Sequence, residues 1–274
     1  MKIPFLSRAP VRELRKPAPA KFPDLPTLRV GALYRGARVG GDFFDFIQVG
    51  SSRFLVLLLD IAGKRDEALH IAATIQDVFH GAADLFYADD VNEPVALISM
   101  LLDINRAIME AAGGVRCAPA FLGCYNEVLG TCCYVNAGHT PALLKYNDGN
   151  IVTFDASGLP LGLFSHATHD AQMCVMDEGS ALVLVSRGLI EAKAHKEEFG
   201  LERVKQALKD APGHDAEALC KLVLERVREF LESQHKHRLL SKSNHQIADS
   251  DPLGENDTTT LALVRCAAAV AKAP

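Results

Sequence analysis

The chain has 274 residues, of which 49% are hydrophobic and 23% charged, and these values are ordinary for a globular protein that can bury a sizeable core. Its formal net charge of −5 argues against a general nucleic-acid binder, which normally presents a basic face. The sequence contains no signal peptide and no apolar run near 18 residues. It therefore predicts a cytoplasmic protein that neither spans nor binds a membrane.

The first 26 residues lack the pattern of a helix or a strand. They contain six of the thirteen prolines and six basic residues against two acidic ones, a composition that forms regular structure poorly. We therefore expect residues 1–26 to be a disordered, basic, proline-rich tail. The folded domain is expected to span residues 27–266, and residues 267–274 to form a second tail.

From residue 28 onward, strand patterns alternate with a few helical ones. Apolar and polar residues alternate from Leu28 to Arg35, which predicts a strand, and the unbroken apolar run 54–59 predicts a strand buried on both faces. Helices are predicted over 66–87 and from Pro94 onward. Further strands are predicted near 119–125, 129–136, 141–146, 151–154, 173–176, 181–185 and 259–265, and further helices at 198–211 and 215–233.

These elements indicate an α+β fold in which antiparallel sheets carry helices on the outside. The polar segment 234–256 is predicted to be a mobile loop. The seven cysteines include no C-x-x-C pair, and we expect reduced thiols that fill the core. Cys132 and Cys133 are neighbours in a predicted strand, so their side chains should point to opposite faces.

Acidic residues stand at the ends of two of these strands. Asp60 ends the buried run, where a carboxylate is costly unless a cation or another partner offsets its desolvation. Asp42 and Asp45 lie beside a Gly-Gly pair, where the backbone can turn tightly and approach a ligand. Oxygen ligands from separate strands suit a hard cation such as Mg²⁺ or Mn²⁺, although acidic residues at strand ends also serve as simple turn or cap residues.

Six short motifs occur in order between residues 28 and 266. They are Gly40-Gly41-Asp42-Phe43-Phe44-Asp45, Asp60-Ile61-Ala62-Gly63-Lys64, Asn136-Ala137-Gly138-His139-Thr140-Pro141, Gly158-Leu159-Pro160-Leu161-Gly162, Glu197-Glu198-Phe199-Gly200-Leu201-Glu202 and Asp257-Thr258-Thr259-Thr260-Leu261. In this order the chain resembles the metal-dependent serine/threonine phosphatases of type 2C, in the bacterial subclass typified by the stage II sporulation E phosphatase. The resemblance implies a sandwich of two antiparallel β-sheets flanked by helices on both outer faces.

The resemblance also implies a metal centre, with Mn²⁺ or Mg²⁺, between the sheet ends. By that resemblance Asp60 bridges two metals, the main-chain carbonyl of Ile61 binds one, and Asp42 and Asp257 complete the carboxylates. Asp42 and Asp60 are then the catalytic carboxylates, because in the family a metal-activated water attacks phosphorus in line. The mechanism needs no Cys or Ser nucleophile.

The sequence departs from the family at three positions. The family has a further metal-binding Asp in a T-D-G motif, and this chain has Arg187 in its place. Arginine stays cationic and does not ligate a metal. Arg65 replaces a glycine after Lys64, and Thr258 replaces the second Asp of the closing motif. Three carboxylates and one guanidinium leave about two negative charges, so we expect one tight metal site and doubt a second.

Two functions follow from these departures. In one, Arg187 clamps the phosphate in place of the second cation, Arg65 and Lys64 help to bind it, and the protein is a phosphatase acting on a phosphorylated regulatory protein such as an anti-sigma-factor antagonist. In the other, the protein is a catalytically impaired pseudophosphatase that binds a phosphoprotein or regulator without turnover.

Smaller alternatives concern single residues near this centre. Arg187 could point to solvent and only weaken one metal site. Asp66 or Glu67 could supply the missing carboxylate, although acidic residues in a first helical turn commonly just favour the helix dipole. His139 is expected to be a buried, hydrogen-bonded histidine and not a catalytic one.

Overall fold

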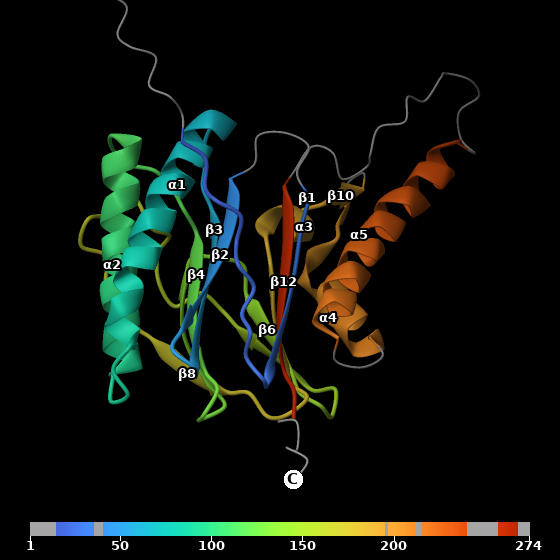
Figure 1. Cartoon of the computed structure of the whole chain (residues 1–274). Coiled ribbons are helices and arrows are strands. Elements are labelled where there is room, and N and C mark those ends of the chain that lie inside the picture. The colour runs from blue at the N-terminus through green and yellow to red at the C-terminus, as the bar shows by residue number, and fades with distance from the viewer. Residues whose placement is uncertain (1–14, 36–40, 195–196, 212–214, 240–256, 268–274) are drawn as a thin grey trace, which may run out of the picture.

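Two five-stranded antiparallel sheets pack face to face in the computed structural model, with helices on both outer faces (Figure 1). The structure describes residues 15–35, 41–194, 197–211, 215–239 and 257–267, with the backbone alone for 233–239. The predicted fold, a sandwich of two antiparallel β-sheets flanked by helices on both outer faces, is therefore confirmed. Among the described helices, none combines the length and the apolar character that crossing a bilayer requires.

The first sheet has the strand order β2-β3-β4-β5-β8 and the second has the order β1-β12-β9-β6-β7. The strands of the first sheet are β2 (Asp42–Val49), β3 (Arg53–Asp60), β4 (Ala120–Asn126), β5 (Thr131–Ala137) and β8 (Gln172–Val175). Those of the second are β1 (Leu28–Arg35), β12 (Thr258–Arg265), β9 (Ala181–Val185), β6 (Ala142–Lys145) and β7 (Ile151–Phe154). A short hairpin of β10 (Lys193–Ala194) and β11 (Glu197–Glu198) stands outside both sheets.

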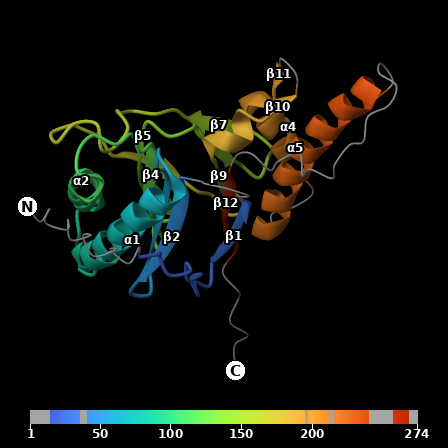
Figure 2. The same ribbon diagram turned by 90° about the horizontal axis from the view of Figure 1, so that it is seen from above.

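Helices cover the outer face of each sheet. The helices α1 (Arg65–Gly81) and α2 (Glu93–Ala112), joined by the 3₁₀ helix η1 (Ala82–Phe86), lie on the first sheet. The helices α3 (Arg187–Ile190), α4 (Gly200–Asp210) and α5 (Ala216–Leu239) lie on the side of the second sheet. Figure 2 shows the resulting order of layers from above, with α1 and α2 on one side and α4 and α5 on the other.

Three hydrophobic clusters fill the spaces between these four layers. The strand β3 takes part in two of them, because Leu55, Leu57 and Leu59 pack under the helices and the residues between them pack between the sheets. This position explains the unbroken apolar run, since successive strand residues face opposite sides and both sides are buried. Cys132 and Cys133 likewise belong to different clusters, as predicted for neighbours on a strand.

The helices differ from the sequence-based expectation mainly at their ends. The predicted helix 66–87 is α1 followed by η1, and α2 begins one residue before Pro94, where the side chain of Asn92 accepts the N–H of Val95 at 3.2 Å. The backbone of α5 continues to Leu239, past the predicted end at residue 233. Part of the predicted mobile loop 234–256 is therefore helical, and residues 240–256 lie outside the described residues.

The prediction of a tail over residues 1–26 needs correction at residues 15–26. They form no helix or strand, but the N–H and the carbonyl of Ala18 both bond to the side chain of Gln76 on α1, at 2.7 and 3.0 Å. Leu25 is only 2% exposed and joins the cluster between the sheets. Single anchoring residues of this kind leave no periodic pattern for sequence reasoning to find. Residues 1–14 lie outside the described residues.

Asp45 joins β2 to α1 and does not line the loop before β2. Its carboxylate, 1% exposed, accepts hydrogen bonds from Gln76 at 2.9 Å and His80 at 2.8 Å. We expect Asp45→Ala to lower the free energy of unfolding by about 2 kcal/mol, because the α1 side chains lose a charged acceptor. Urea unfolding measures this loss. The matched control is Asp77→Ala on the same helix, whose partner Arg15 is exposed and whose loss should be close to neutral. Equal stability of the Asp45→Ala variant and the parent would contradict the prediction.

Candidate metal and phosphate site

Two carboxylates of the first sheet lie opposite each other at one end of neighbouring strands. Asp42 begins β2, Asp60 ends β3, and the two are direct partners in the antiparallel register. The Ile61 N–H then donates to the Gly41 carbonyl at 2.7 Å. A Cβ at position 41 would stand 2.1 Å from the Ile61 oxygen, so only glycine allows this close approach. Gly41 thus brings both carboxylates and the Ile61 carbonyl together.

Strand β12 of the second sheet also contacts this end of the first sheet. The Thr259 hydroxyl donates to Asp42 Oδ2 at 2.7 Å, and the Thr259 N–H donates to the Ser186 hydroxyl at 2.9 Å. Asp257 directly precedes β12, and its Oδ2 accepts the Tyr34 hydroxyl at 2.7 Å. Asp42, Asp60 and Asp257 therefore lie at the same end of the sandwich, and the Thr259–Asp42 hydrogen bond joins the two sheets there.

Burial is the main influence on the protonation of this cluster. Burial raises the pKa of Asp42 to about 7, the hydrogen bonds from Thr259 and Ser186 oppose this, and the charges of Asp60 and Asp257 raise the pKa further. The pKa of Asp257 is also raised by burial, against the Tyr34 hydrogen bond and the charge of Arg65. A carboxylate that is costly to ionise in this surrounding favours a bound cation.

Arg187 supplies a cation at this point. It follows Ser186 at the end of β9 and begins α3, and its Nη2 lies 3.0 Å from Asp60 Oδ2. The Arg187 side chain is 54% exposed and that of Asp60 is 14% exposed. The structure thus directs the guanidinium to the carboxylate that the family resemblance makes the bridging ligand, and the reading in which Arg187 points to solvent does not hold.

The loop after β3 carries the other two basic residues named from the sequence. Arg65 is the first residue of α1, and its charge lowers the pKa of Asp257, so it lies within electrostatic reach of the cluster. Lys64 precedes the helix, is exposed and does not cap it with its side chain. Arg116, which sequence reasoning missed, donates to the Ala62 carbonyl at 3.1 Å and to Glu67 at 3.0 Å. Arg116 therefore links the loop after β3 to the first turn of α1, and Glu67 is engaged in this ion pair.

His139 is a structural residue, as predicted. It is 4% exposed, its N–H donates to the Asn136 side chain at 2.9 Å, and its ring Nδ1 lies 3.1 Å from the Thr140 hydroxyl. Burial lowers its pKa to about 4, which keeps the ring neutral near pH 7. The Thr140 hydroxyl donates to the Val185 carbonyl, so this turn fixes the end of the strand that leads to Arg187.

Sequence reasoning also missed Tyr34, Ser186 and Thr259 as partners of the carboxylates. Thr259 lies inside the closing motif and Ser186 directly precedes Arg187, so their positions beside recognised residues were the available clue. Tyr34 had no such clue, because its place follows from the register in which it pairs with Thr259. Thr258, which replaces an acidic residue of the family motif, is 1% exposed and donates to the Arg35 carbonyl at 3.3 Å.

The carboxylate cluster offers oxygen ligands, but hydrogen bonds and an ion pair already engage them. Within the described residues, no three His, Cys, Asp or Glu side chains are arranged to hold one. One oxygen of each carboxylate is already bonded, to Thr259, to Arg187 or to Tyr34. The hard oxygen donors and the buried Asp42 charge suit one Mn²⁺ or Mg²⁺ if Asp60 gives up Arg187. The Arg187 guanidinium, 3.0 Å from Asp60, occupies one oxygen of the carboxylate that the family resemblance makes the bridging ligand.

Comparison with known proteins gives a family match over most of the domain. The family model described as stage II sporulation protein E (SpoIIE) matches residues 50–238. Protein IcfG of Synechocystis sp. (strain PCC 6803) is 25% identical over 211 residues, which cover 69% of this chain and 33% of IcfG. Phosphoserine phosphatase RsbP of Bacillus subtilis (strain 168) is 21% identical over 204 residues, which cover 73% of this chain and 47% of RsbP. The chain spans less than half the length of these curated relatives.

Solved structures share the fold. The RsbU and RsbW domains of Rv1364c from Mycobacterium tuberculosis match with a TM-score of 0.66 at 22% identity, covering 89% of this chain and 63% of that chain. The catalytic domain of the serine/threonine protein phosphatase PstP, solved in complex with two manganese ions, matches with a TM-score of 0.59 at 14% identity, covering 88% of this chain and 99% of that chain. At these identities the likeness establishes the fold alone.

Proposed function

Because the chain belongs to the stage II sporulation protein E family, we propose that it is a metal-dependent protein serine/threonine phosphatase with an atypical, arginine-containing centre. The observation that carries this proposal is the cluster at the sheet ends, where Asp42, Asp60 and Asp257 meet and the pKa of Asp42 is raised to about 7. Its substrate would be a phosphorylated regulatory protein, such as an anti-sigma-factor antagonist. The similarity to RsbP, a phosphoserine phosphatase, supports a phosphorylated serine as the target.

The residues of the centre would have two roles, metal binding and positioning of the metal-binding carboxylates. Asp42, Asp60 and the Ile61 carbonyl would hold one Mn²⁺ or Mg²⁺, which when bound supplies the activation of a water for attack on phosphorus. The hydroxyls of Thr259 and Ser186 keep the Asp42 carboxylate in place. Tyr34 does the same for Asp257.

Phosphate binding would fall to the basic residues. The guanidinium of Arg187 has several donors, so on leaving Asp60 it could hold two phosphoryl oxygens at once. Arg65 and Lys64 stand at the start of α1 beside the cluster and would draw the phosphorylated segment toward it by charge.

Asp60 gives the direct test of this function. We expect Asp60→Asn to weaken Mn²⁺ binding by about a hundredfold or more and to remove manganese-dependent hydrolysis of para-nitrophenyl phosphate, because the central ligand loses its charge. Calorimetry measures the first and absorbance the second. The matched control is Asp66→Asn, an exposed acidic residue of the first turn of α1, which should leave both values unchanged. Equal metal affinity in Asp60→Asn and the parent would refute the proposed site.

A pseudophosphatase is the second candidate function, and the 3.0 Å ion pair between Arg187 and Asp60 favours it. In that case the centre binds a phosphoprotein through Arg187 without turnover. A phosphoserine peptide and its unphosphorylated form distinguish the two functions when each is titrated into the protein with Mn²⁺ present. Selective binding together with release of inorganic phosphate supports the enzyme, whereas selective binding without release supports the pseudophosphatase.

A further inference from the structure

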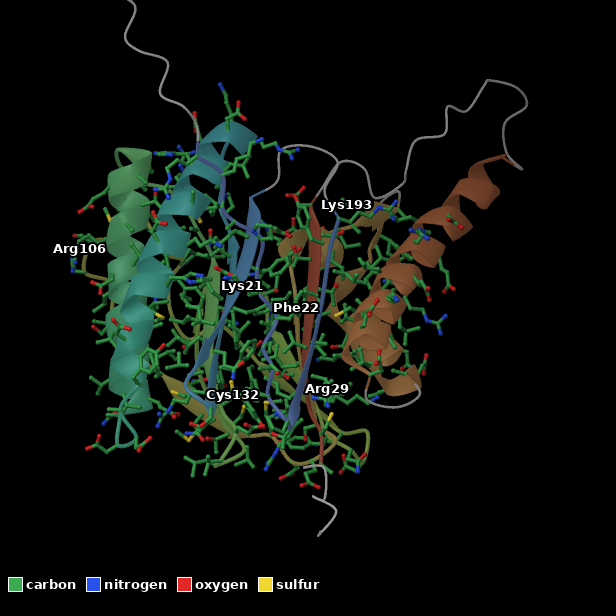
Figure 3. The ribbon with its side chains drawn as sticks, in the orientation of Figure 1. Lys21, Phe22, Arg29, Arg106, Cys132 and Lys193 are labelled. Atoms are coloured by element: carbon green, nitrogen blue, oxygen red, sulfur yellow. The ribbon has the colours of Figure 1, made fainter. Side chains whose placement is uncertain are left out.

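Two cysteines lie directly opposite each other at the edge of the first sheet, away from the carboxylate cluster. Cys132 on β5 and Cys174 on β8 are partners in the antiparallel register. Figure 3 labels Cys132 in the lower part of the sandwich. Opposite residues of such a pair have Cα atoms about 4.5–5.5 Å apart, which lies inside the range of about 4.4–6.8 Å that a disulfide bond needs. Both side chains belong to the hydrophobic cluster between the sheets, and the Cys132 thiol donates to the Cys133 carbonyl at 3.8 Å.

We propose that Cys132 and Cys174 form a redox-active dithiol that a small disulfide, such as oxidised glutathione, converts into a disulfide bond between β5 and β8. Both residues are free thiols in the structure. The bond would fasten β8, a four-residue strand at the end of its sheet whose one sheet neighbour is β5.

The two thiols differ in a way that assigns their roles. Cys174 lies on the edge strand and is 9% exposed, whereas Cys132 is 0% exposed. The neighbouring Cys132 thiol lowers the pKa of Cys174, against the effect of burial, and Cys174 together with burial raises the pKa of Cys132. Cys174 is therefore the thiol that meets the oxidant, and Cys132 is the one that resolves the intermediate.

The exchange balances in two steps. The Cys174 thiolate attacks one sulfur of oxidised glutathione, the glutathione S–S bond breaks, and one glutathione thiolate leaves and takes up the proton that Cys174 lost. Cys132 then loses its proton and attacks the Cys174 sulfur of the mixed disulfide, which releases the second glutathione as a thiol. The protein is oxidised by two electrons, and one oxidised glutathione is reduced to two thiols.

A second pair of cysteines in the same sheet serves as an internal comparison. Cys124 on β4 and Cys133 on β5 are also direct register partners, but both are 0% exposed and both lie in the cluster beneath α1 and α2. An oxidant cannot reach them without opening the helical layer. Both pairs are register partners, but only Cys174 lies on an edge strand and is partly exposed, so we expect only the Cys132–Cys174 pair to react in the folded protein.

The test treats the folded full-length chain with oxidised glutathione, blocks the remaining thiols by alkylation, and maps cross-linked peptides by mass spectrometry without reduction. We expect the loss of two of the seven thiols, a single Cys132–Cys174 linkage, and reversal by dithiothreitol. The melting temperature should rise by roughly 5–10 °C on linkage, because the closed loop restricts the unfolded chain.

Variants separate this inference from simple surface oxidation. Cys174→Ser should abolish the two-thiol loss, and Cys133→Ala should leave it intact. Mapping of the unsubstituted chain keeps the test valid if a variant folds poorly. A Cys124–Cys133 linkage, a mixed glutathione disulfide on Cys174 that does not resolve, or retention of all seven thiols would each overturn the proposal.

Discussion

Replacing Arg187 with aspartate is expected to raise the manganese stoichiometry from one ion to two and to increase kcat/KM for a small phosphate ester by about a hundredfold or more. The substitution removes the guanidinium that lies 3.0 Å from Asp60 and adds the fourth carboxylate of the family motif. A +1 charge and a +2 charge about 4 Å apart repel by about 8 kcal/mol at an effective dielectric constant near 20, before relaxation and screening. That repulsion is large enough to exclude a tightly bound second dication from the native centre.

Arg187→Gln is the matched control, because it removes the charge without adding a ligand. Arg187→Gln should strengthen binding of the first Mn²⁺ and leave affinity for a second Mn²⁺ weak. Arg187→Asp should allow both ions to bind tightly. Calorimetric titration with Mn²⁺ gives the stoichiometry, and para-nitrophenyl phosphate hydrolysis gives the rate. If the native protein already binds two ions tightly, or if Arg187→Asp changes neither the stoichiometry nor the rate, the charge argument is wrong.

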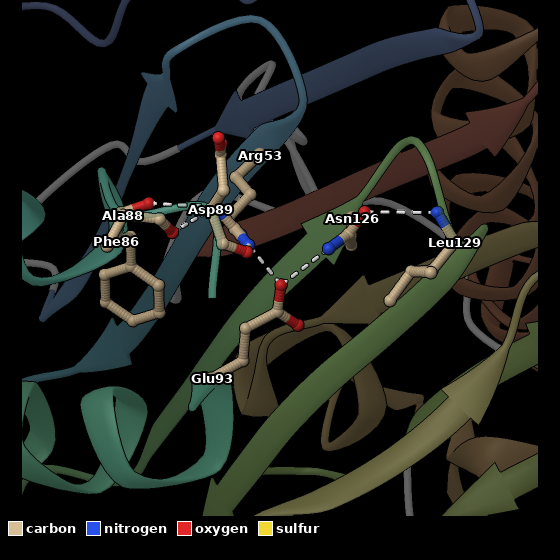
Figure 4. A network of polar contacts seen from close by, with 7 residues as sticks. All are labelled: Arg53, Phe86, Ala88, Asp89, Glu93, Asn126 and Leu129. Carbon is tan, nitrogen blue, oxygen red and sulfur yellow. Dashed lines mark hydrogen bonds and ion pairs between the residues drawn. The ribbon is translucent and has the colours of Figure 1, made fainter. Parts of the chain in front are cut away.

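Arg53→Met should lower the free energy of unfolding by about 3–5 kcal/mol, because it leaves a buried carboxylate without its counter-charge. Arg53 Nε lies 2.8 Å from Glu93 Oε1, and the Arg53 and Glu93 side chains are 8% and 7% exposed. The same Glu93 oxygen accepts the Asn126 amide at 2.7 Å, and the remaining Arg53 nitrogens donate to the carbonyls of Phe86, Ala88 and Asp89 (Figure 4). This network fixes the chain between η1 and α2 on the ends of β3 and β4.

An exposed ion pair of the same kind provides the control. Arg106 and Asp103 on α2 have side chains 68% and 42% exposed, and Arg106→Met should cost less than 1 kcal/mol. The double variant Arg53→Met/Glu93→Leu should recover part of the loss, because it buries no unpaired charge. Urea unfolding measures all three. A loss for Arg53→Met no larger than that for Arg106→Met would mean that the buried pair contributes little.

Periodicity predicted most of the fold because most elements bury a repeating face. The unbroken run of β3 and the alternation of β1 both identified strands that the structure contains. The hairpin of β10 and β11 escaped prediction, since strands of two residues are too short to show a period. The packing of residues 15–26 escaped for a related reason, because Ala18 and Leu25 anchor that segment one residue at a time.

The sequence predicted the site residues that lie within recognisable motifs and missed those outside them. Asp42, Asp60 and Asp257 were identified because the residues beside them are distinctive, and the structure brings all three together. The sequence left open whether the Arg187 side chain points into the carboxylate cluster or toward solvent. The sequence alone does not show which carboxylate a long side chain contacts. Tyr34 was not found at all, since its contact with Asp257 depends on a strand register between distant parts of the chain.

The pairing of β1 with β12 has a consequence for how this protein is made. β1 stands at the edge of its sheet with β12 as its neighbour, and Tyr34 and Asp257 are 223 residues apart. At about 5–20 residues per second, a ribosome needs roughly 10–45 s to synthesise that interval. For most of this time β1 has been synthesised and β12 has not, so β1 has no strand to pair with. Asp42 and Asp60 are likewise made long before Asp257. The carboxylate cluster is therefore among the last parts of the nascent protein to form, and the proposed metal site is complete only after the closing strand has been made.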